Sequence, residues 1–150
     1  MTGAPPRGLE ERLRDTRAKL ASDVDLWVAT SGSAGGVHLI PLSYLWDGTA
    51  FLISTPRASV TGRNLLAEGR VRLSLGPTRD VVVDGTAEPV GIADLGPEAG
   101  DAFATKTGFD PRELDEPYQY FLIRPRRIQA WREANELQGR DLMRDGRWLG

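Results

Sequence analysis

The feature that most restricts how this chain can fold is a succession of short apolar runs, each bounded by glycine, proline or aspartate. Runs of this length, rich in β-branched and aromatic residues and separated by turn signals, are typical of β-strands. Asp47-Gly48, between two such runs, is the strongest local signal for a β-hairpin. Six strands are therefore predicted, over residues 26–30, 37–46, 49–54, 70–75, 80–89 and 118–133.

Three other stretches predict helices. An apolar stripe ahead of Ser22 predicts an amphipathic helix of about three turns. Its members are Leu9, Leu13, Thr16 and Leu20. Two further helices are expected over 59–68 and 92–108, and Gly69 ends the first of them.

The order of these elements predicts one domain over residues 1–150, with a mainly β fold. The first three strands are expected to form an antiparallel meander. Six strands with few helices suit a small antiparallel barrel, whose closure removes free strand edges. A barrel of this size is filled by its own side chains, so a ligand is expected outside it, at a helix–strand junction or between subunits.

Composition excludes several kinds of site. The chain has no cysteine and a single histidine, His38, which excludes disulfides, thiolate chemistry and Cys/His zinc sites. An iron site with two histidines would need one from another chain. With 19 basic and 21 acidic residues, the formal net charge of −2 argues against a general nucleic-acid binder.

No stretch predicts targeting or membrane insertion. Residues 1–17 contain Glu10, Glu11 and Asp15 and lack the apolar core of a signal peptide. No run approaches the roughly 18 consecutive apolar residues of a transmembrane helix. A soluble cytoplasmic protein without a membrane partner is expected.

The segment 54–65 runs from the end of a predicted strand into a predicted helix, and it concentrates four hydroxyls, two guanidinium groups and an amide. Free N–H groups and the positive end of the dipole make a helix N-terminus attractive to anions. Ser59 fits the N-cap position, and Arg57 and Arg63 carry donors suited to phosphate oxygens. A capped helix with solvated arginines explains the same residues, and both interpretations stay open.

From Gly35 to Leu75 the chain resembles the pyridoxamine 5′-phosphate oxidase-like family of flavin and deazaflavin proteins. The shared features are a glycine turn, a strand with a central proline, an Asp-Gly hairpin, a strand ending in threonine, a helix start and an Arg-Val-Arg-Leu strand. In this chain they are Gly36, Pro41, Asp47-Gly48, Thr55, Ser59, Arg63-Asn64-Leu65 and Arg70-Val71-Arg72-Leu73.

This resemblance implies a six-stranded split β-barrel that forms a homodimer, with a cofactor at each subunit interface. It implies that the cofactor phosphate is surrounded by Thr55, Arg57, Ser59, Arg63 and Asn64, with Thr61 in place of the lysine frequent in the family. It places the ring system along His38, Leu39, Ile40, Pro41 and Ser43. The second subunit would contribute an aromatic residue from its C-terminal part, Trp131 or Trp148.

Two departures from the family pattern bear on the cofactor. Thr61 removes a positive charge from the phosphate site, which weakens the case for FMN. The segments 124–127 and 131–133 resemble an actinobacterial branch in which many proteins use the deazaflavin coenzyme F-420. Its phosphodiester and glutamate tail suit a broad basic rim, for which the candidates are Arg57, Arg63, Arg124, Arg126 and Arg127. Residues 124–127 are equally explained as strand-edge charges that oppose sheet pairing.

Three other groups of residues carry side chains suited to chemistry. His38 suits a hydrogen bond to a ring carbonyl or axial ligation of haem, but no Gly-x-Ser-x-Gly motif supports a catalytic triad. Asp80, Asp84 and Glu88 alternate along a strand and indicate one solvated face. Tyr118 and Tyr120 carry phenols that suit a proton donor, although the sequence places neither beside a substrate.

We therefore expect an oxidoreductase that transfers a hydride between bound F-420 and a small conjugated substrate, with FMN as the alternative cofactor. A non-catalytic dimer that binds a flavin or F-420 is the competing hypothesis, because binding residues are visible in the sequence and a proton donor is not. A barrel that has lost its ligand site is a third.

Overall fold

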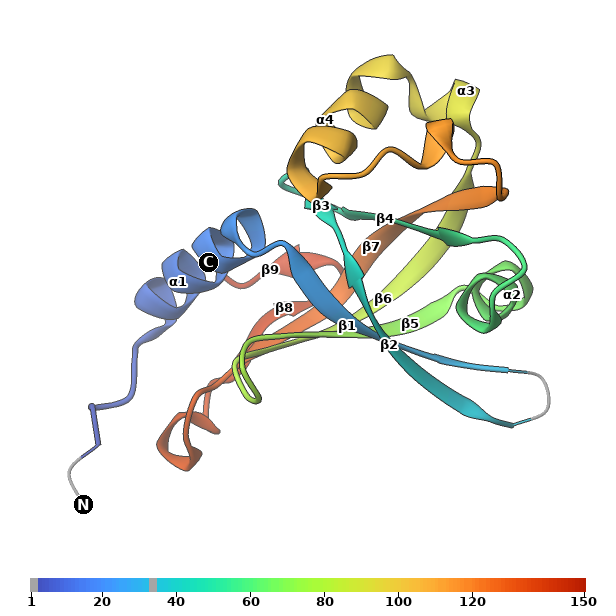
Figure 1. Ribbon diagram of the computed structural model, residues 1–150. Helices are drawn as coiled ribbons and strands as arrows, with labels where there is room; N and C mark the ends of the chain where they lie inside the picture. Colours follow the sequence, from blue (N-terminus) through green and yellow to red (C-terminus); the bar gives the residue numbers. More distant parts are fainter. Residues whose placement is uncertain (1–2, 33–34) are drawn as a thin grey trace.

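The computed structural model describes residues 3–32 and 35–150, which form one curled antiparallel sheet with helices around it (Figure 1). The strands are β1 (Asp25–Ser31), β2 (Val37–Ser43), β3 (Leu45–Trp46), β4 (Phe51–Pro56), β5 (Arg70–Leu75), β6 (Val81–Val90), β7 (Tyr118–Ala130), β8 (Asp141–Arg144) and β9 (Arg147–Trp148). The helices are α1 (Leu9–Ser22), α2 (Val60–Ala67), α3 (Ile92–Leu95) and α4 (Pro97–Thr107), with 3-10 turns at Pro111–Glu113 and Ala134–Glu136. The predicted mainly β, antiparallel fold is confirmed.

The strands are hydrogen-bonded in the order β2-β1-β5-β6-β7-β4-β3, and β8 and β9 extend the sheet from β7. The concave side holds the main core, in which Phe51, Ile53 and Phe121 are fully buried together with Leu65 of α2. Alternate residues of β1, β5 and β6 face away from this core, as expected for strands with one packed side. β2 stands at one end of the order, so among the described residues its second edge has no strand partner.

The predicted meander of the first three strands does not form. β4 does not pair with β2, and its long partner is β7, in a register that sets Thr55 opposite Gln119. The strand predicted over 37–46 is divided at Tyr44, whose side chain is fully buried. The chain bends there from its pairing with β1 to a short pairing with β4. This bend leaves the barrel split between β2 and β4.

The predicted hairpin at Asp47-Gly48 is confirmed. The Asp47 carboxylate accepts hydrogen bonds from the N–H groups of Thr49 and Ala50, at 2.8 and 2.7 Å. Gly48 has a φ of 101°, in the left-handed region that favours glycine. The local turn signal was sufficient to place this connection, although not to find the later partner of β4.

The helix predicted over 92–108 consists of two helices. Gly96, with a φ of 86°, ends α3, and Pro97 begins α4 at the position where a missing N–H costs nothing. The pair lies at the top of Figure 1, over the side of β4 and β7 that faces away from the main core. There Phe103 packs against Leu52 and Tyr120 in a second, smaller core. None of the helices in the described ranges is long and apolar enough to cross a membrane.

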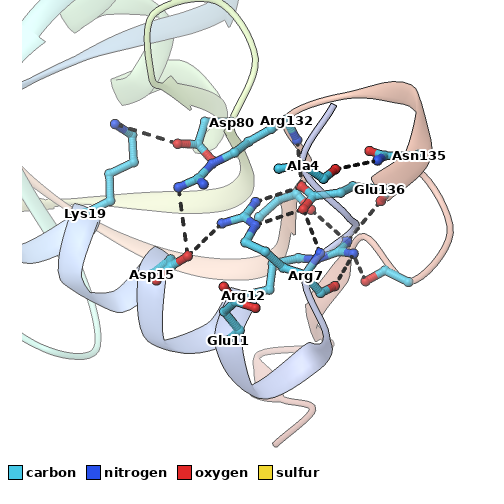
Figure 2. A network of polar contacts seen from close by, with 12 residues as sticks. Ala4, Arg7, Glu11, Arg12, Asp15, Lys19, Asp80, Arg132, Asn135 and Glu136 are labelled. Atoms are coloured by element: carbon cyan, nitrogen blue, oxygen red, sulfur yellow. Dashed lines mark hydrogen bonds and ion pairs between the residues drawn. The ribbon is translucent and has the colours of Figure 1, made fainter. Parts of the chain in front are cut away.

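A buried ion pair ties the N-terminal arm to the turn after β7 (Figure 2). Arg7 and Glu136 are only 8% and 4% exposed. The Glu136 carboxylate accepts hydrogen bonds from the backbone N–H, Nε and Nη2 of Arg7 at 2.8 to 3.0 Å. The buried guanidinium of Arg12 lies beside this pair and donates to four carbonyl oxygens. These contacts fix α1 and the residues before it against the end of the sheet.

Candidate functional site

The N-terminus of α2 follows β4 directly, and Ser59 is its N-cap, as predicted. The Ser59 hydroxyl accepts a hydrogen bond from the Gly62 N–H at 3.0 Å and donates to the Pro56 carbonyl oxygen at 2.7 Å. Thr55 Oγ1 lies 3.3 Å from Ser59 Oγ and is the donor of that pair, because the Ser59 proton is engaged by Pro56. Other N–H groups of the first turn have no intrahelical acceptor, which leaves positive potential at this end of α2.

Gly62 lets α2 approach the end of β4 closely. A Cβ at this position would lie 2.5 Å from the Pro56 carbonyl oxygen and 2.8 Å from that of Arg57. Both of these atoms belong to the backbone, so the contact cannot be relieved by moving a side chain. The lack of a side chain at position 62 therefore allows the first turn of α2 to pack next to the backbone of Arg57.

Arg57 and Arg63 are both exposed at this junction. The Arg57 backbone N–H donates to the Pro117 carbonyl oxygen at 2.9 Å, and its Nη1 donates to Oε1 of Gln119 on β7. Because the side-chain partner is a neutral amide, no carboxylate among the described residues offsets the positive charge of this guanidinium. We call the group formed by Thr55, Arg57, Ser59, Arg63 and the first turn of α2 the anchor.

Asn64 connects α2 to the hairpin of β1 and β2. Its Nδ2 donates to Thr30 Oγ1 at 3.0 Å, and its Oδ1 would lie 3.0 Å from a Cβ at Gly32. Thr30 stands opposite His38 in the ladder, and opposite residues of an antiparallel pair share one face. His38 therefore shares with Thr30 the face of the hairpin to which Asn64 of α2 is bonded.

The predicted ring-binding residues of β2 are divided between its two faces, because side chains alternate along a strand. His38 and Ile40 are half-buried on the face shared with Thr30, whereas Leu39 and Pro41 are exposed on the opposite face. Ser43 lies at the end of the strand, where its hydroxyl donates to Asp25 at 2.7 Å. A planar group stacked on one face of β2 would meet only one of these two sets.

Two predicted residues do not lie with the exposed arginines of the anchor. Thr61 is fully buried, on the same side of α2 as Leu65, and its hydroxyl has no hydrogen-bond partner within the described ranges. Trp131 follows the far end of β7, and the path along the strand from Gln119 is about 40 Å at normal strand spacing. Trp131 therefore lies away from the anchor of its own chain.

Tyr120 is not available to a substrate outside the barrel. It is 2% exposed and packs edge-to-face against Phe103, with ring centroids 5.6 Å apart. Burial raises the pKa of its phenol, and its hydroxyl has no partner among the residues described. Tyr118 is half-buried beside Phe109. Neither tyrosine is therefore placed as a proton donor beside the anchor.

The remaining arginines of the predicted basic rim lie on the outer face of the sheet. Arg124 pairs with Glu88 at 2.9 Å and Arg127 pairs with Asp141 at 3.2 Å, which neutralises both. A shallow depression of about 450 Å³ on this face is lined by ten residues, Arg126 among them and Arg57 not. The anchor and this face are therefore separate in one chain. No cluster of three or more potential metal ligands occurs within residues 3–32 and 35–150.

The curled antiparallel sheet, split between β2 and β4, is that of a split β-barrel protein. Residues 15–132 match the family model for pyridoxamine 5′-phosphate oxidase, and the chain belongs to this family. No protein of curated function matches the sequence.

Solved structures share the fold. A FAD-binding protein from Mesorhizobium loti has a TM-score of 0.59 and 17% identity, covering 77% of this chain and 90% of that one. An F420 reductase has a TM-score of 0.58 and 19% identity, covering 75% and 94%. A haem-binding protein from Mycobacterium smegmatis has a TM-score of 0.63 and 20% identity, covering 96% and 60%. At these identities the likeness establishes the fold alone.

Thr30, Gly62 and Gln119 belong to the site but were not predicted. Gly62 stands three residues after the Ser59 cap, a position at which a close approach of backbone could have been suspected from the sequence. Thr30 and Gln119 act through partners 34 and 62 residues away, and no local pattern indicates such partners.

Proposed function

We propose that the anchor binds the anionic tail of a flavin-type cofactor, with F-420 as the first choice and FMN as the alternative. The observation that carries this proposal is the exposed, uncompensated guanidinium of Arg57 beside the Ser59-capped N-terminus of α2. Guanidinium groups, a hydroxyl and helix N–H groups together suit phosphate oxygens. The family of the chain, and neighbours named as FAD-binding and as an F420 reductase, support the same class of ligand.

The open form of the anchor favours F-420 over FMN. Both arginines are exposed, and Thr61, which replaces the family's lysine, is turned into the protein. A phosphomonoester is best held in an enclosed pocket with several charges, whereas a phosphodiester continues outward into its glutamate tail. An anchor with two exposed guanidinium groups suits the second arrangement.

We propose further that the protein is an oxidoreductase. When bound, the tricyclic ring would supply hydride transfer to or from a small conjugated substrate. The chain would hold the tail at the anchor and orient the ring along β2, where Asn64 fixes the hairpin relative to α2. A non-catalytic binding dimer is distinguished by mixing reduced cofactor with quinones or enones, because only an enzyme accelerates its oxidation.

The proposed active form is a homodimer with the cofactor between subunits. Val37 and Leu39 are 81% and 58% exposed on β2, and Trp27 on the same face of β1 is 46% exposed. An apolar strand with a free edge is a surface that proteins normally cover. Because Trp131 is too far from the anchor of its own chain, a second copy would have to supply it.

The decisive test of the anchor is equilibrium binding of FMN and F-420, measured by fluorescence titration. The variant carrying both Arg57→Ala and Arg63→Ala should lose at least about 100-fold in affinity, since each charged hydrogen bond contributes roughly 1.5 to 3 kcal/mol. Its circular dichroism should match that of the wild type, because both side chains are exposed. Unchanged affinity in the double variant would rule out the anchor as the phosphate site.

Haem binding is a second candidate, favoured by the placement of His38. It is the single histidine of the chain, it lies half-buried on β2, and one neighbour of the same fold is named as haem-binding. Titration with haemin tests this function. A Soret band that disappears in His38→Ala, while FMN and F-420 fail to bind the wild type, would favour haem over a flavin-type cofactor.

A further inference from the structure

The orientation of the Gln119 amide is determined by its surroundings. Its Nε2 donates to the carbonyl oxygens of Val90 at 3.0 Å and Tyr120 at 3.1 Å. Both amide protons are thereby used on the backbone of β6 and β7, which leaves Oε1 directed at the Nη1 of Arg57. A flipped amide would set Oε1 against two carbonyl oxygens, so only one orientation is favourable.

Arg57 is thus held at two points, its backbone N–H on Pro117 just before β7 and its guanidinium on Gln119 of β7. An exposed arginine on a turn ordinarily samples many rotamers, and binding an anion requires it to lose that freedom. A carboxylate at position 119 would orient the guanidinium but cancel its charge. A neutral amide orients it and leaves the charge for a ligand.

We propose that Gln119 is a positioning residue, which orients the Arg57 guanidinium toward the phosphate group of the cofactor. The inference rests on the proposed function of the anchor, and it adds to that function a residue 62 positions away in the chain. Gln119 does not itself contact the ligand, because its donors are bound to the backbone. Its effect must therefore pass through Arg57.

The test compares a phosphorylated ligand with its phosphate-free counterpart in the same variant. The pairs are FMN with riboflavin, and F-420 with its deazaflavin core without the phosphodiester tail. In Gln119→Leu the affinity for FMN or F-420, whichever the wild type binds, should fall about tenfold, the loss expected for one hydrogen bond to a charged group. The phosphate-free counterpart should bind as it does to the wild type. A general loss of folding would weaken both ligands and leave their ratio unchanged.

Gln129→Leu is the matched control. Gln129 lies on the same strand, is also half-buried, and donates to Asp141 at 2.8 Å, away from the anchor. In Gln129→Leu the ratio of the affinity for the phosphorylated ligand to that for its phosphate-free counterpart should equal the wild-type ratio. Gln119→Ala, which removes the same amide without adding a bulky apolar side chain, should repeat the result of Gln119→Leu.

The two proposals fail in different ways. If Arg57→Ala does not weaken the binding of FMN or F-420, the anchor is not the phosphate site and the positioning role of Gln119 is wrong as well. If Arg57→Ala weakens binding but Gln119→Leu does not alter the ratio, the anchor stands and the positioning role is wrong. If Gln119→Leu costs the same tenfold in an Arg57→Ala background, Gln119 does not act through Arg57.

Discussion

At the scale of single residues, Arg7 and Arg57 show how the same side chain takes opposite roles. Arg7 is buried and its charge is paired with the Glu136 carboxylate, so the loss of either partner would destabilise the folded state. Arg57 is exposed and meets a neutral amide, so its charge stays available for a ligand. The distinction depends on which partner the tertiary structure supplies, which is why the sequence alone did not decide between solvated arginines and a phosphate site.

The Arg7–Glu136 pair should dominate any stability change in this region. Glu136→Gln removes the carboxylate from a buried guanidinium and should lower the free energy of unfolding by about 3 to 5 kcal/mol. The same substitution in the exposed Arg124–Glu88 pair, Glu88→Gln, should cost about 1 kcal/mol at most. Chemical denaturation of both variants measures the difference. Equal losses would show that burial does not strengthen the Arg7–Glu136 pair.

The same pair should contribute to the acid sensitivity of the fold. The hydrogen bonds from Arg7 hold the pKa of Glu136 well below its usual value, despite the opposing effect of burial. A carboxylate with a lowered folded pKa stabilises the protein above the unfolded pKa, about 4.3, and this contribution is lost as the pH falls below it. Stability measured from pH 6 downward should therefore decline less steeply in Glu136→Gln than in the wild type.

At the scale of elements, the anchor forms because the first turn of α2 packs closely against the end of β4. Gly62→Ala would place a methyl group 2.5 Å from the Pro56 carbonyl oxygen and push the helix away from Arg57. We expect a loss of about 1 to 3 kcal/mol in unfolding free energy together with weaker FMN or F-420 binding. Gly36→Ala is the control, since a Cβ there meets open space. Normal stability and binding in Gly62→Ala would mean that α2 is not held by this contact.

Elements defined by local signals were predictable, and elements defined by distant partners were not. Asp47-Gly48 and the Ser59 cap were found because each acts within four residues. The pairing of β4 with β7 was missed because nothing near residue 55 indicates a partner near residue 119. The hairpin of β8 and β9 was also missed, although Asp145-Gly146 carries the same signal as Asp47-Gly48 and both residues have positive φ.

At the scale of the whole molecule, one chain leaves an apolar face exposed and does not bring Trp131 to the anchor. β2 carries the apolar side chains Val37 and Leu39 on an exposed face and ends the sheet with an edge that no described strand covers. Trp131, expected at the cofactor, lies at the opposite end of β7 from the anchor. We propose that a second copy packs on the outer face of β1 and β2 and covers this apolar surface, with its own C-terminal half contributing to the cofactor site.

This dimer is tested by placing a charge on the proposed interface. Leu39→Asp buries an unpaired carboxylate if β2 is covered by a partner, so light scattering should show a shift from dimer to monomer. Leu114→Asp makes the same change at a residue 45% exposed in the segment after α4, and should leave the mass unchanged.

If the cofactor lies between subunits, the monomeric Leu39→Asp should also lose FMN or F-420 binding with its anchor residues intact. A wild type that is monomeric, or a Leu39→Asp monomer that still binds the cofactor with normal affinity, would place the complete site within one chain.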